Sequence, residues 1–238
     1  MKTFAIAASV AAAALTVPAA ASAQTYDFAN FGNSVFSYGS GTTGASFAPF
    51  TAANTFAGGC FGQANFACAT AGGQSGFPVI GVNTGATTVS FETVDLPVNT
   101  LLFHPASGGS GTDAILSFTA PTTSLYNVSG TFSRLDRTPT GGNGVAVLAI
   151  GGSTIFSGAI PAGAQGSGFS FNQTVSLVAG QTIFLGVNNA GEYTFDSTGL
   201  TGAIRAVPEP ASWALMILGF GVAGYALRRR TRATVAFA

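Results

Sequence analysis

The stretch Val145-Ala146-Val147-Leu148-Ala149-Ile150-Gly151-Gly152-Ser153-Thr154-Ile155-Phe156-Ser157 carries the clearest fold signal in the chain. Its first half is apolar without a break, as expected of a strand that is covered on both faces. Two glycines follow at once, and a second strand-like run begins directly after them. Two such runs separated by a Gly-Gly pair predict a β-hairpin.

Strand-like runs recur at short spacing on both sides of this hairpin, and apolar and polar residues alternate in several of them. They cover residues 88–93, 114–119, 126–132, 169–177, 182–187, 193–195 and 201–204. Glycine-rich turns separate the runs, and no long helical period lies between residues 24 and 206. We therefore predict an all-β fold, a jelly-roll-like β-sandwich. The looser segment 24–85 is interpreted as further strands and long loops of the same domain rather than as a separate stalk.

The N-terminus has the three parts of a secretory signal peptide. Lys2 supplies a positive charge, residues 4–17 are apolar, and Ala21-Ser22-Ala23 is a small-residue cleavage site. The apolar stretch is too short for a mature membrane span, which needs roughly 20 residues. We predict a signal helix over residues 1–23 that signal peptidase removes, so that the mature chain begins at Gln24. An N-terminal core helix is the alternative.

The C-terminus is built differently. Pro208-Glu209-Pro210 interrupts any regular element, because two prolines within three residues continue neither a helix nor a central strand. Residues 211–227 are apolar enough for a marginal transmembrane helix with Trp213 at one interface. The basic residues after this run should stay cytoplasmic, which places the preceding domain outside the membrane, in agreement with the signal peptide. They are Arg228, Arg229, Arg230 and Arg232.

Together, the Pro-Glu-Pro triplet, Trp213, the run 215–221 and the arginines resemble the PEP-CTERM sorting signal of Gram-negative bacteria. The resembling tail covers residues 207–238. The resemblance implies that an integral membrane exosortase recognises the motif, cleaves near it, and releases or re-attaches the protein. The chain would then pass through the inner membrane transiently and end at the cell surface or outside the cell. A plain C-terminal membrane anchor is the alternative.

Charge is scarce in the predicted mature domain. Residues 24–206 contain seven acids, three arginines and no lysine, which leaves a net charge of −4. A domain without a basic patch is not expected to bind nucleic acid, because phosphate neutralisation supplies most of that affinity. His104 is the only histidine, and its place before a proline at a strand end suits a structural hydrogen bond. No Gly-x-Ser-x-Gly elbow is present, so we do not expect an enzyme.

Cys60 and Cys68 are the only cysteines, and both lie in the exported part. A cysteine pair in an oxidising compartment predicts a disulfide. A metal site is the alternative, although one histidine and no second cysteine pair supply few ligands for it.

Two kinds of side chain are candidates for binding. Asp136 and Asp196 follow strand-like runs, where carboxylates and backbone carbonyls together suit Ca²⁺. The alternative is that Asp136 pairs with a neighbouring arginine and Asp196 caps a turn. Tyr38 and Tyr193 are candidates for stacking against sugar rings, whereas Tyr126 belongs to an alternating strand and should be buried. No cofactor other than Ca²⁺ is expected.

The central region contains the motifs Phe36-Ser37-Tyr38-Gly39, Phe118-Thr119-Ala120-Pro121, residues 126–132 and residues 195–200. They resemble a domain found repeatedly in exported PEP-CTERM proteins, which is similar to the β-sandwich carbohydrate-binding modules. The resemblance runs from about residue 26 to residue 204. Phe36 and Phe118 stand where the resembling domains carry tryptophan.

These observations predict an exported, exosortase-sorted and non-enzymatic surface or matrix protein, associated with exopolysaccharide or biofilm and a candidate for glycan binding. A secreted carbohydrate-active enzyme is one alternative, which two carboxylates facing one cleft would favour. A structural spacer is another, which a surface without aromatic rings or charges would favour.

Overall fold

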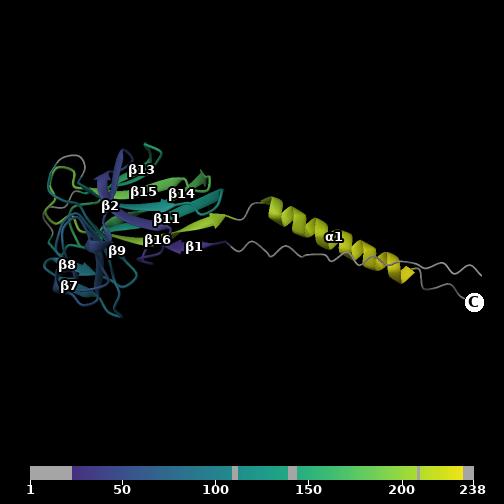
Figure 1. Ribbon diagram of the computed structural model, residues 1–238, viewed down its shortest axis with the longest axis horizontal. Helices are drawn as coiled ribbons and strands as arrows, with labels where there is room; N and C mark the ends of the chain where they lie inside the picture. Colours follow the sequence, from purple (N-terminus) through teal and green to yellow (C-terminus); the bar gives the residue numbers. More distant parts are fainter. Residues whose placement is uncertain (1–22, 109–111, 139–143, 208–209, 233–238) are drawn as a thin grey trace, which may run out of the picture. The chain divides into compact units, whose positions relative to one another are not determined.

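The computed structural model describes residues 23–108, 112–138, 144–207 and 210–232 (Figure 1). One compact unit spans Ala23–Val207, against the predicted domain of 24–206. Helix α1 (Pro210–Arg232) lies outside this unit. Residues 1–22 of the predicted signal peptide, together with Pro208 and Glu209 of the sorting motif, lie outside the described residues.

The larger sheet has eight antiparallel strands, in the order β14-β11-β16-β9-β6-β5-β4, with β1 paired to β16. The long strand β16 pairs through residues 198–200 with β9 and through residues 203–205 with β1. The strands are β1 (Thr25–Asp27), β4 (Thr55–Phe56), β5 (Phe66–Thr70), β6 (Val79–Asn83), β9 (Leu101–His104), β11 (Ser124–Arg134), β14 (Gly168–Leu177) and β16 (Thr198–Val207).

The smaller sheet has six antiparallel strands in the order β13-β12-β15-β10-β2-β3. The predicted Gly-Gly hairpin is confirmed as β12 and β13, and Gly151 and Gly152 turn it with positive φ angles of 53° and 87°. Both central residues of such a two-residue turn need positive φ, which glycine adopts without a steric cost. The strands are β2 (Phe36–Thr42), β3 (Ser46–Pro49), β10 (Asp113–Thr119), β12 (Val145–Ile150), β13 (Ser153–Ala159) and β15 (Thr182–Asn188).

The two sheets confirm the predicted all-β sandwich. From β9 to β16 the chain alternates between them, except at the β12–β13 hairpin. The glycine-rich segment 24–85 contributes strands to both sheets, as predicted, and is not a separate stalk. The predicted strand at residues 193–195 is wrong: these residues form part of the loop between β15 and β16, where Phe195 has a φ of 63° that a strand does not accommodate.

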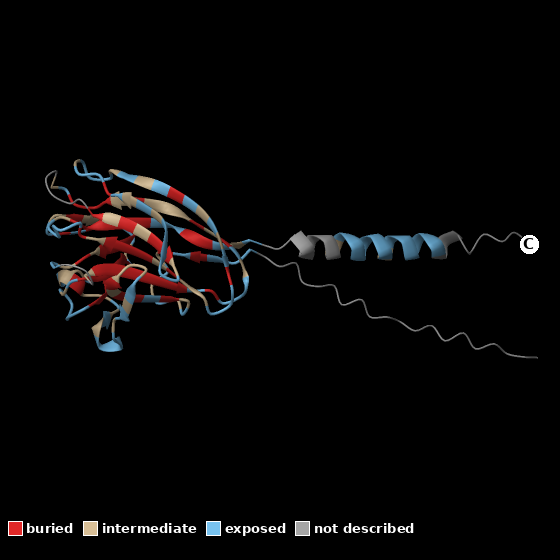
Figure 2. Cartoon of the chain, turned by 90° about the horizontal axis from the view of Figure 1, so that it is seen from above, coloured by how far each residue is buried: buried red, intermediate tan, exposed pale blue. Residues whose placement is uncertain are grey.

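The main core lies between the inner faces of the sheets, where Figure 2 shows the buried residues gathered. Because side chains alternate along a strand, every second one points inward. Many of these inward side chains are aromatic. Tyr126 is fully buried, as predicted, and its hydroxyl donates to the Thr122 carbonyl at 2.7 Å. Phe36 and Phe118 are also core residues and pack against each other with ring centroids 5.8 Å apart.

A second, smaller core covers the outer face of β5, β6 and β9 in the larger sheet. Alternation along β9 separates the two cores: Leu101 and Phe103 face inward, while Leu102 belongs to the outer core. The short hairpin of β7 (Val89–Phe91) and β8 (Val94–Leu96) and the 3-10 turn η2 (Cys60–Gly62) contribute the covering residues. A further 3-10 turn, η1 (Ala52–Asn54), precedes β4. The predicted disulfide between Cys60 and Cys68 is confirmed and ties η2 to β5.

Helix α1 occupies the segment that was predicted to cross the membrane, and it includes Pro210, Trp213 and the arginines. Within the described part of the chain, no helix is long and apolar enough to cross a membrane.

Candidate functional site: an aromatic pocket

A cavity of about 270 Å³ opens beside the outer core of the larger sheet. Its walls come from η2, the turn before β6, strand β9, the tip of the β7–β8 hairpin, the segment after β11 and the β15–β16 loop. Segments far apart in the sequence therefore meet at this one place. We call this cavity, with its lining residues, the aromatic pocket.

Aromatic rings set at different angles form one wall of the aromatic pocket. Phe77 contacts Phe61, with ring centroids 5.4 Å apart and planes tilted by 51°, and it contacts the His104 ring at 4.5 Å. Tyr193 meets His104 edge-on at 6.4 Å. Phe77 and Tyr193 are 37% and 39% exposed, so both rings remain accessible to a ligand. Rings at different angles produce a concave surface rather than a closed stack.

Two carboxylates line the same pocket, Asp136 from the segment after β11 and Glu92 from the hairpin tip. Asp136 is buried, and its two oxygens accept hydrogen bonds from the Thr93 hydroxyl at 2.6 Å and the Ser197 amide at 2.8 Å. A carboxylate has roughly four acceptor positions, so these two donors leave room for others. Glu92 is exposed at the rim.

Backbone strain gathers around the pocket. Five described residues other than glycine have positive φ angles, and three of them line the cavity: Phe61 at 50°, Glu92 at 47° and Phe195 at 63°. A bulky side chain rarely adopts this region, because its β-carbon crowds the backbone. Such residues persist only where the surrounding structure holds them, and they concentrate at functional sites.

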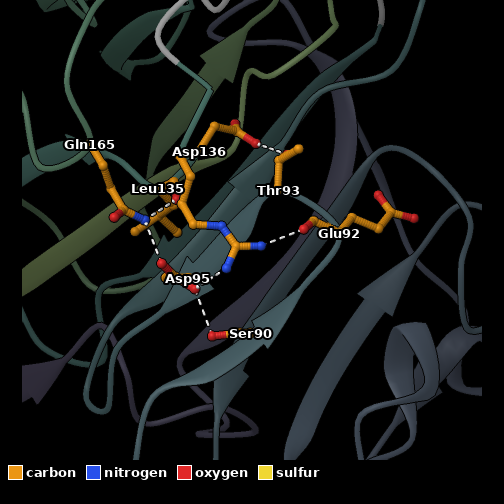
Figure 3. Close-up of polar contacts among 8 residues, drawn as sticks. Ser90, Glu92, Thr93, Asp95, Leu135, Asp136 and Gln165 are labelled. Carbon is orange, nitrogen blue, oxygen red and sulfur yellow. Dashed lines mark hydrogen bonds and ion pairs between the residues drawn. The ribbon is translucent and has the colours of Figure 1, made fainter.

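A network of polar contacts fixes the hairpin tip in place (Figure 3). Arg137 forms an ion pair with Asp95 at 3.2 Å and donates to the Glu92 carbonyl. Asp95 also accepts from the Ser90 hydroxyl at 2.6 Å and the Gln165 amide at 3.2 Å. Gln165 in turn donates to the Leu135 carbonyl at 2.7 Å, which joins the hairpin to the end of β11. The Ser90 hydrogen bond is the main cause that lowers the pKa of Asp95.

His104 ends strand β9 at the wall of the pocket. Its Nδ1 lies 2.6 Å from the Pro105 carbonyl, which is the structural hydrogen bond that the sequence predicted. Desolvation lowers the pKa of His104, although the Pro105 carbonyl and the nearby charges of Asp136 and Glu92 act in the opposite direction. The ring is therefore neutral near pH 7.

The two tyrosines singled out from the sequence have different places. Tyr193 lines the aromatic pocket, whereas Tyr38 is only 8% exposed and stacks on Phe31 with ring centroids 4.4 Å apart. Burial raises the pKa of Tyr38 to about 12, and its hydroxyl accepts a hydrogen bond from the Gly32 amide. Tyr38 is thus a core residue and is not placed to stack on a sugar, because its position in β2 points inward.

The structure separates the two aspartates proposed for Ca²⁺. Asp136 lines the aromatic pocket, while Asp196 is buried and lines a different, smaller hollow together with Arg134. The neighbouring Arg137 pairs with Asp95 rather than with Asp136. Among the residues that the structure describes, no three histidine, cysteine, aspartate or glutamate side chains form a group that would hold a metal ion.

Sequence reasoning missed Phe61, Phe77 and Glu92. Two of the three residues had a weak signal in the sequence: Phe61 directly follows a disulfide cysteine, and Glu92 is one of only seven acids in the domain. Neither signal places these residues beside Tyr193, because they come from separate loops that only the folded sheet brings together.

Comparison with known proteins identifies the tail of the chain. Residues 206–230 match the family model of the PEP-CTERM protein-sorting motif. The chain therefore carries this motif, which implies export and processing by exosortase. No curated protein sequence matches the chain.

Solved structures similar to the sandwich are distant. One is the CBM51 from Clostridium perfringens GH95 in complex with methyl-galactose, with 15% identity and a TM-score of 0.34, covering 52% of this chain and 83% of that one. Another is the tandem CBM51 modules of the family 98 glycoside hydrolase from Streptococcus pneumoniae, with 16% identity and a TM-score of 0.36, covering 52% and 37%. The K3 adhesin domain of Lys-gingipain from Porphyromonas gingivalis has 9% identity and a TM-score of 0.31, covering 45% and 72%. Likeness of this extent carries no argument about what this chain binds.

Proposed function

We propose that this protein is a non-enzymatic surface or matrix component that exosortase sorts and that binds glycan at the aromatic pocket. The observation that carries the binding proposal is the pocket itself: accessible rings of Phe77 and Tyr193 stand beside the carboxylates of Asp136 and Glu92. Sugar rings combine apolar faces with hydroxyl groups, and an aromatic surface with a few placed polar groups provides partners for both. Exopolysaccharide is the glycan that an exported matrix protein meets.

We also propose the jelly roll as the detailed architecture of the sandwich. Four strands of each sheet support it, in the orders β14-β11-β16-β9 and β13-β12-β15-β10, connected by repeated crossings between the sheets.

The aromatic pocket lies on the outer face of one sheet, so the core that fills the interior does not compete with a ligand for it.

A glycan array tests the binding proposal. The full-length protein is screened beside the Tyr193→Ala and Phe77→Ala variants, and beside Leu125→Ala, which removes an exposed apolar side chain away from the pocket. Loss of a stacking ring should weaken glycan binding about tenfold or more, since burying an aromatic side chain contributes about 1.5–3 kcal/mol. The Leu125→Ala variant should bind as the original protein does. An array that stays blank with folded protein would rule out the binding proposal and favour the spacer.

A second candidate, a carbohydrate-active enzyme, has one observation in its favour: two carboxylates line the same pocket. Glycoside hydrolysis needs one carboxyl group that is protonated and one that is ionised. Asp136 accepts two hydrogen bonds, from the Thr93 hydroxyl and the Ser197 amide, and Glu92 is exposed at the rim. Release of reducing ends from a bound glycan, abolished by both Glu92→Gln and Asp136→Asn, would establish the enzyme instead.

A further inference from the structure

The charge of the aromatic pocket has one sign. Of the residues that line it, Glu92 and Asp136 are acidic, and none is a lysine or an arginine. His104 is the one residue there that would become cationic, and desolvation keeps it neutral. The guanidinium of Arg137 is close by but is directed to Asp95 and the Glu92 backbone. A ligand therefore meets an acidic lining, in which Glu92 is exposed at the rim and Asp136 is buried in the wall, and the lining residues include no lysine or arginine.

The aromatic rings of the pocket also attract a positively charged group, as the carboxylates do. An aromatic face carries partial negative charge and attracts a cation within about 6 Å of its centroid. Phe61, Phe77 and Tyr193 line the pocket at different angles, so that a group entering it faces more than one ring. Rings and carboxylates around one cavity favour an ammonium group over an acetamide, because only the ammonium group carries a net positive charge.

The size of the cavity limits what enters. At about 270 Å³ it lies just below the range of roughly 300–1,000 Å³ typical of small-molecule sites, which suits a single ring of a polymer rather than several. The rest of the glycan would remain in solvent at the open side, where Phe77, Glu92 and Tyr193 are exposed.

We infer that the aromatic pocket recognises a protonated amino sugar, the unacetylated hexosamine unit of a polysaccharide. The ammonium group lies at the rim, beside Glu92 and the exposed rings of Phe77 and Tyr193, and the buried Asp136 stands behind them in the wall of the pocket. This inference rests on the proposed glycan-binding function and specifies the class of glycan. The domain as a whole agrees with it, since residues 24–206 carry a net charge of −4 and no lysine.

The test compares two probes of equal length: oligomers of glucosamine and fully N-acetylated oligomers. Their binding to the full-length, disulfide-intact protein is measured by titration calorimetry. The titrations are made at about pH 6, where the amine of glucosamine is protonated. We expect the glucosamine oligomer to bind at least tenfold more tightly. Glu92→Gln should weaken this binding by about three- to tenfold, in line with one rim charge, and leave binding of the acetylated oligomer unchanged. Tyr193→Ala should weaken both.

The matched control is Asp27→Asn, which removes one exposed carboxylate on β1 that does not line the pocket. It should leave glucosamine binding unchanged; a loss as large as that of Glu92→Gln would show general attraction to an acidic surface and overturn the inference. Equal binding of the two oligomers would also overturn it while the glycan-binding function stands. If neither oligomer binds but the glycan array is positive, the amino-sugar inference is overturned and the glycan-binding function stands. If the array is blank as well, the proposed function is also overturned.

Discussion

At the scale of single residues, two aspartates near the pocket have different roles. Asp136 lines the cavity, whereas Asp95 joins the β7–β8 hairpin to the end of β11 through Ser90, Gln165 and Arg137. The tip of that hairpin carries Glu92, whose backbone carbonyl accepts a hydrogen bond from Arg137, so the position of Glu92 depends on the contacts of Asp95. Asp95 is 25% exposed, and its contacts should therefore contribute moderately to stability.

Asp95→Asn should lower the free energy of unfolding at pH 7 by about 1 kcal/mol, because it weakens three charge-assisted contacts. The pKa of Asp95 is lowered in the fold from its ordinary 3.8, so its contribution is complete above that value and is lost as the pH falls through the folded-state pKa. Urea unfolding at pH 7 and at about pH 3 measures this. The difference in the free energy of unfolding between the variant and the original protein should be smaller at the lower pH. An equal difference at both pH values would contradict the role of the Asp95 charge.

His104 provides a second pH dependence. Desolvation lowers its pKa from 6.5, so the fold favours the neutral ring and stability is complete above that value. As the pH falls below it, the unfolded chain takes up the proton first and the fold loses stability. His104→Gln should remove this slope between about pH 7 and pH 5, above the range where carboxylates titrate. Thermal unfolding across that interval is the measurement, and an unchanged slope would assign it to other groups.

At the scale of elements, the centre of the larger sheet depends on a close approach of two strands. Gly130 of β11 lies opposite Gly202 of β16, and a β-carbon at position 130 would come within 2.3 Å of the Thr201 carbonyl oxygen. The contact is with backbone, which has little freedom to move away within a paired strand.

Gly130→Ala should therefore lower the free energy of unfolding by about 2 kcal/mol or more, as overpacking in a core does. Gly72→Ala is the matched control, because a β-carbon at position 72 meets nothing within 4 Å. Denaturant unfolding of both variants gives the comparison. Equal stability of the two would show that β11 and β16 separate at little cost.

The outer layer depends on a different element, the disulfide between η2 and β5. Replacing both Cys60 and Cys68 by alanine should cost about 2–3 kcal/mol, because the closed loop no longer restricts the unfolded chain. Phe61 follows Cys60, so glycan binding at the aromatic pocket should weaken as well. Urea unfolding with and without a reductant measures the first effect. Reductant should destabilise the original protein and leave the double variant unchanged; a response of the variant would point to another cause.

At the scale of the whole molecule, the sandwich and the sorting tail have separate tasks. The sandwich, Ala23–Val207, contains both cores and the aromatic pocket, and the PEP-CTERM motif occupies residues 206–230. Removal of the tail would leave every strand of the two sheets in place, since β16 ends at Val207.

Intact-mass spectrometry of the protein from its native host tests this division. We expect a chain that begins at Gln24, ends near Val207 and lacks two hydrogens because of the disulfide. Signal peptidase and exosortase remove the two ends in this scheme. A full-length C-terminus would instead indicate a protein anchored by its tail.

The sequence by itself determined what depends on local pattern. The Gly-Gly hairpin, the cysteine pair and the sorting motif each reside in a few neighbouring residues, whose backbone preferences or chemistry act over short distances. The all-β class follows from a short alternating pattern that recurs along the chain. Only the tertiary structure decided which aromatic residues are accessible. Tyr38 and Tyr193 look alike in the sequence, yet strand alternation buries the first, and the β15–β16 loop places the second in the pocket. Phe61, Phe77 and Glu92 join it through strand pairing over long distances, which local sequence does not encode.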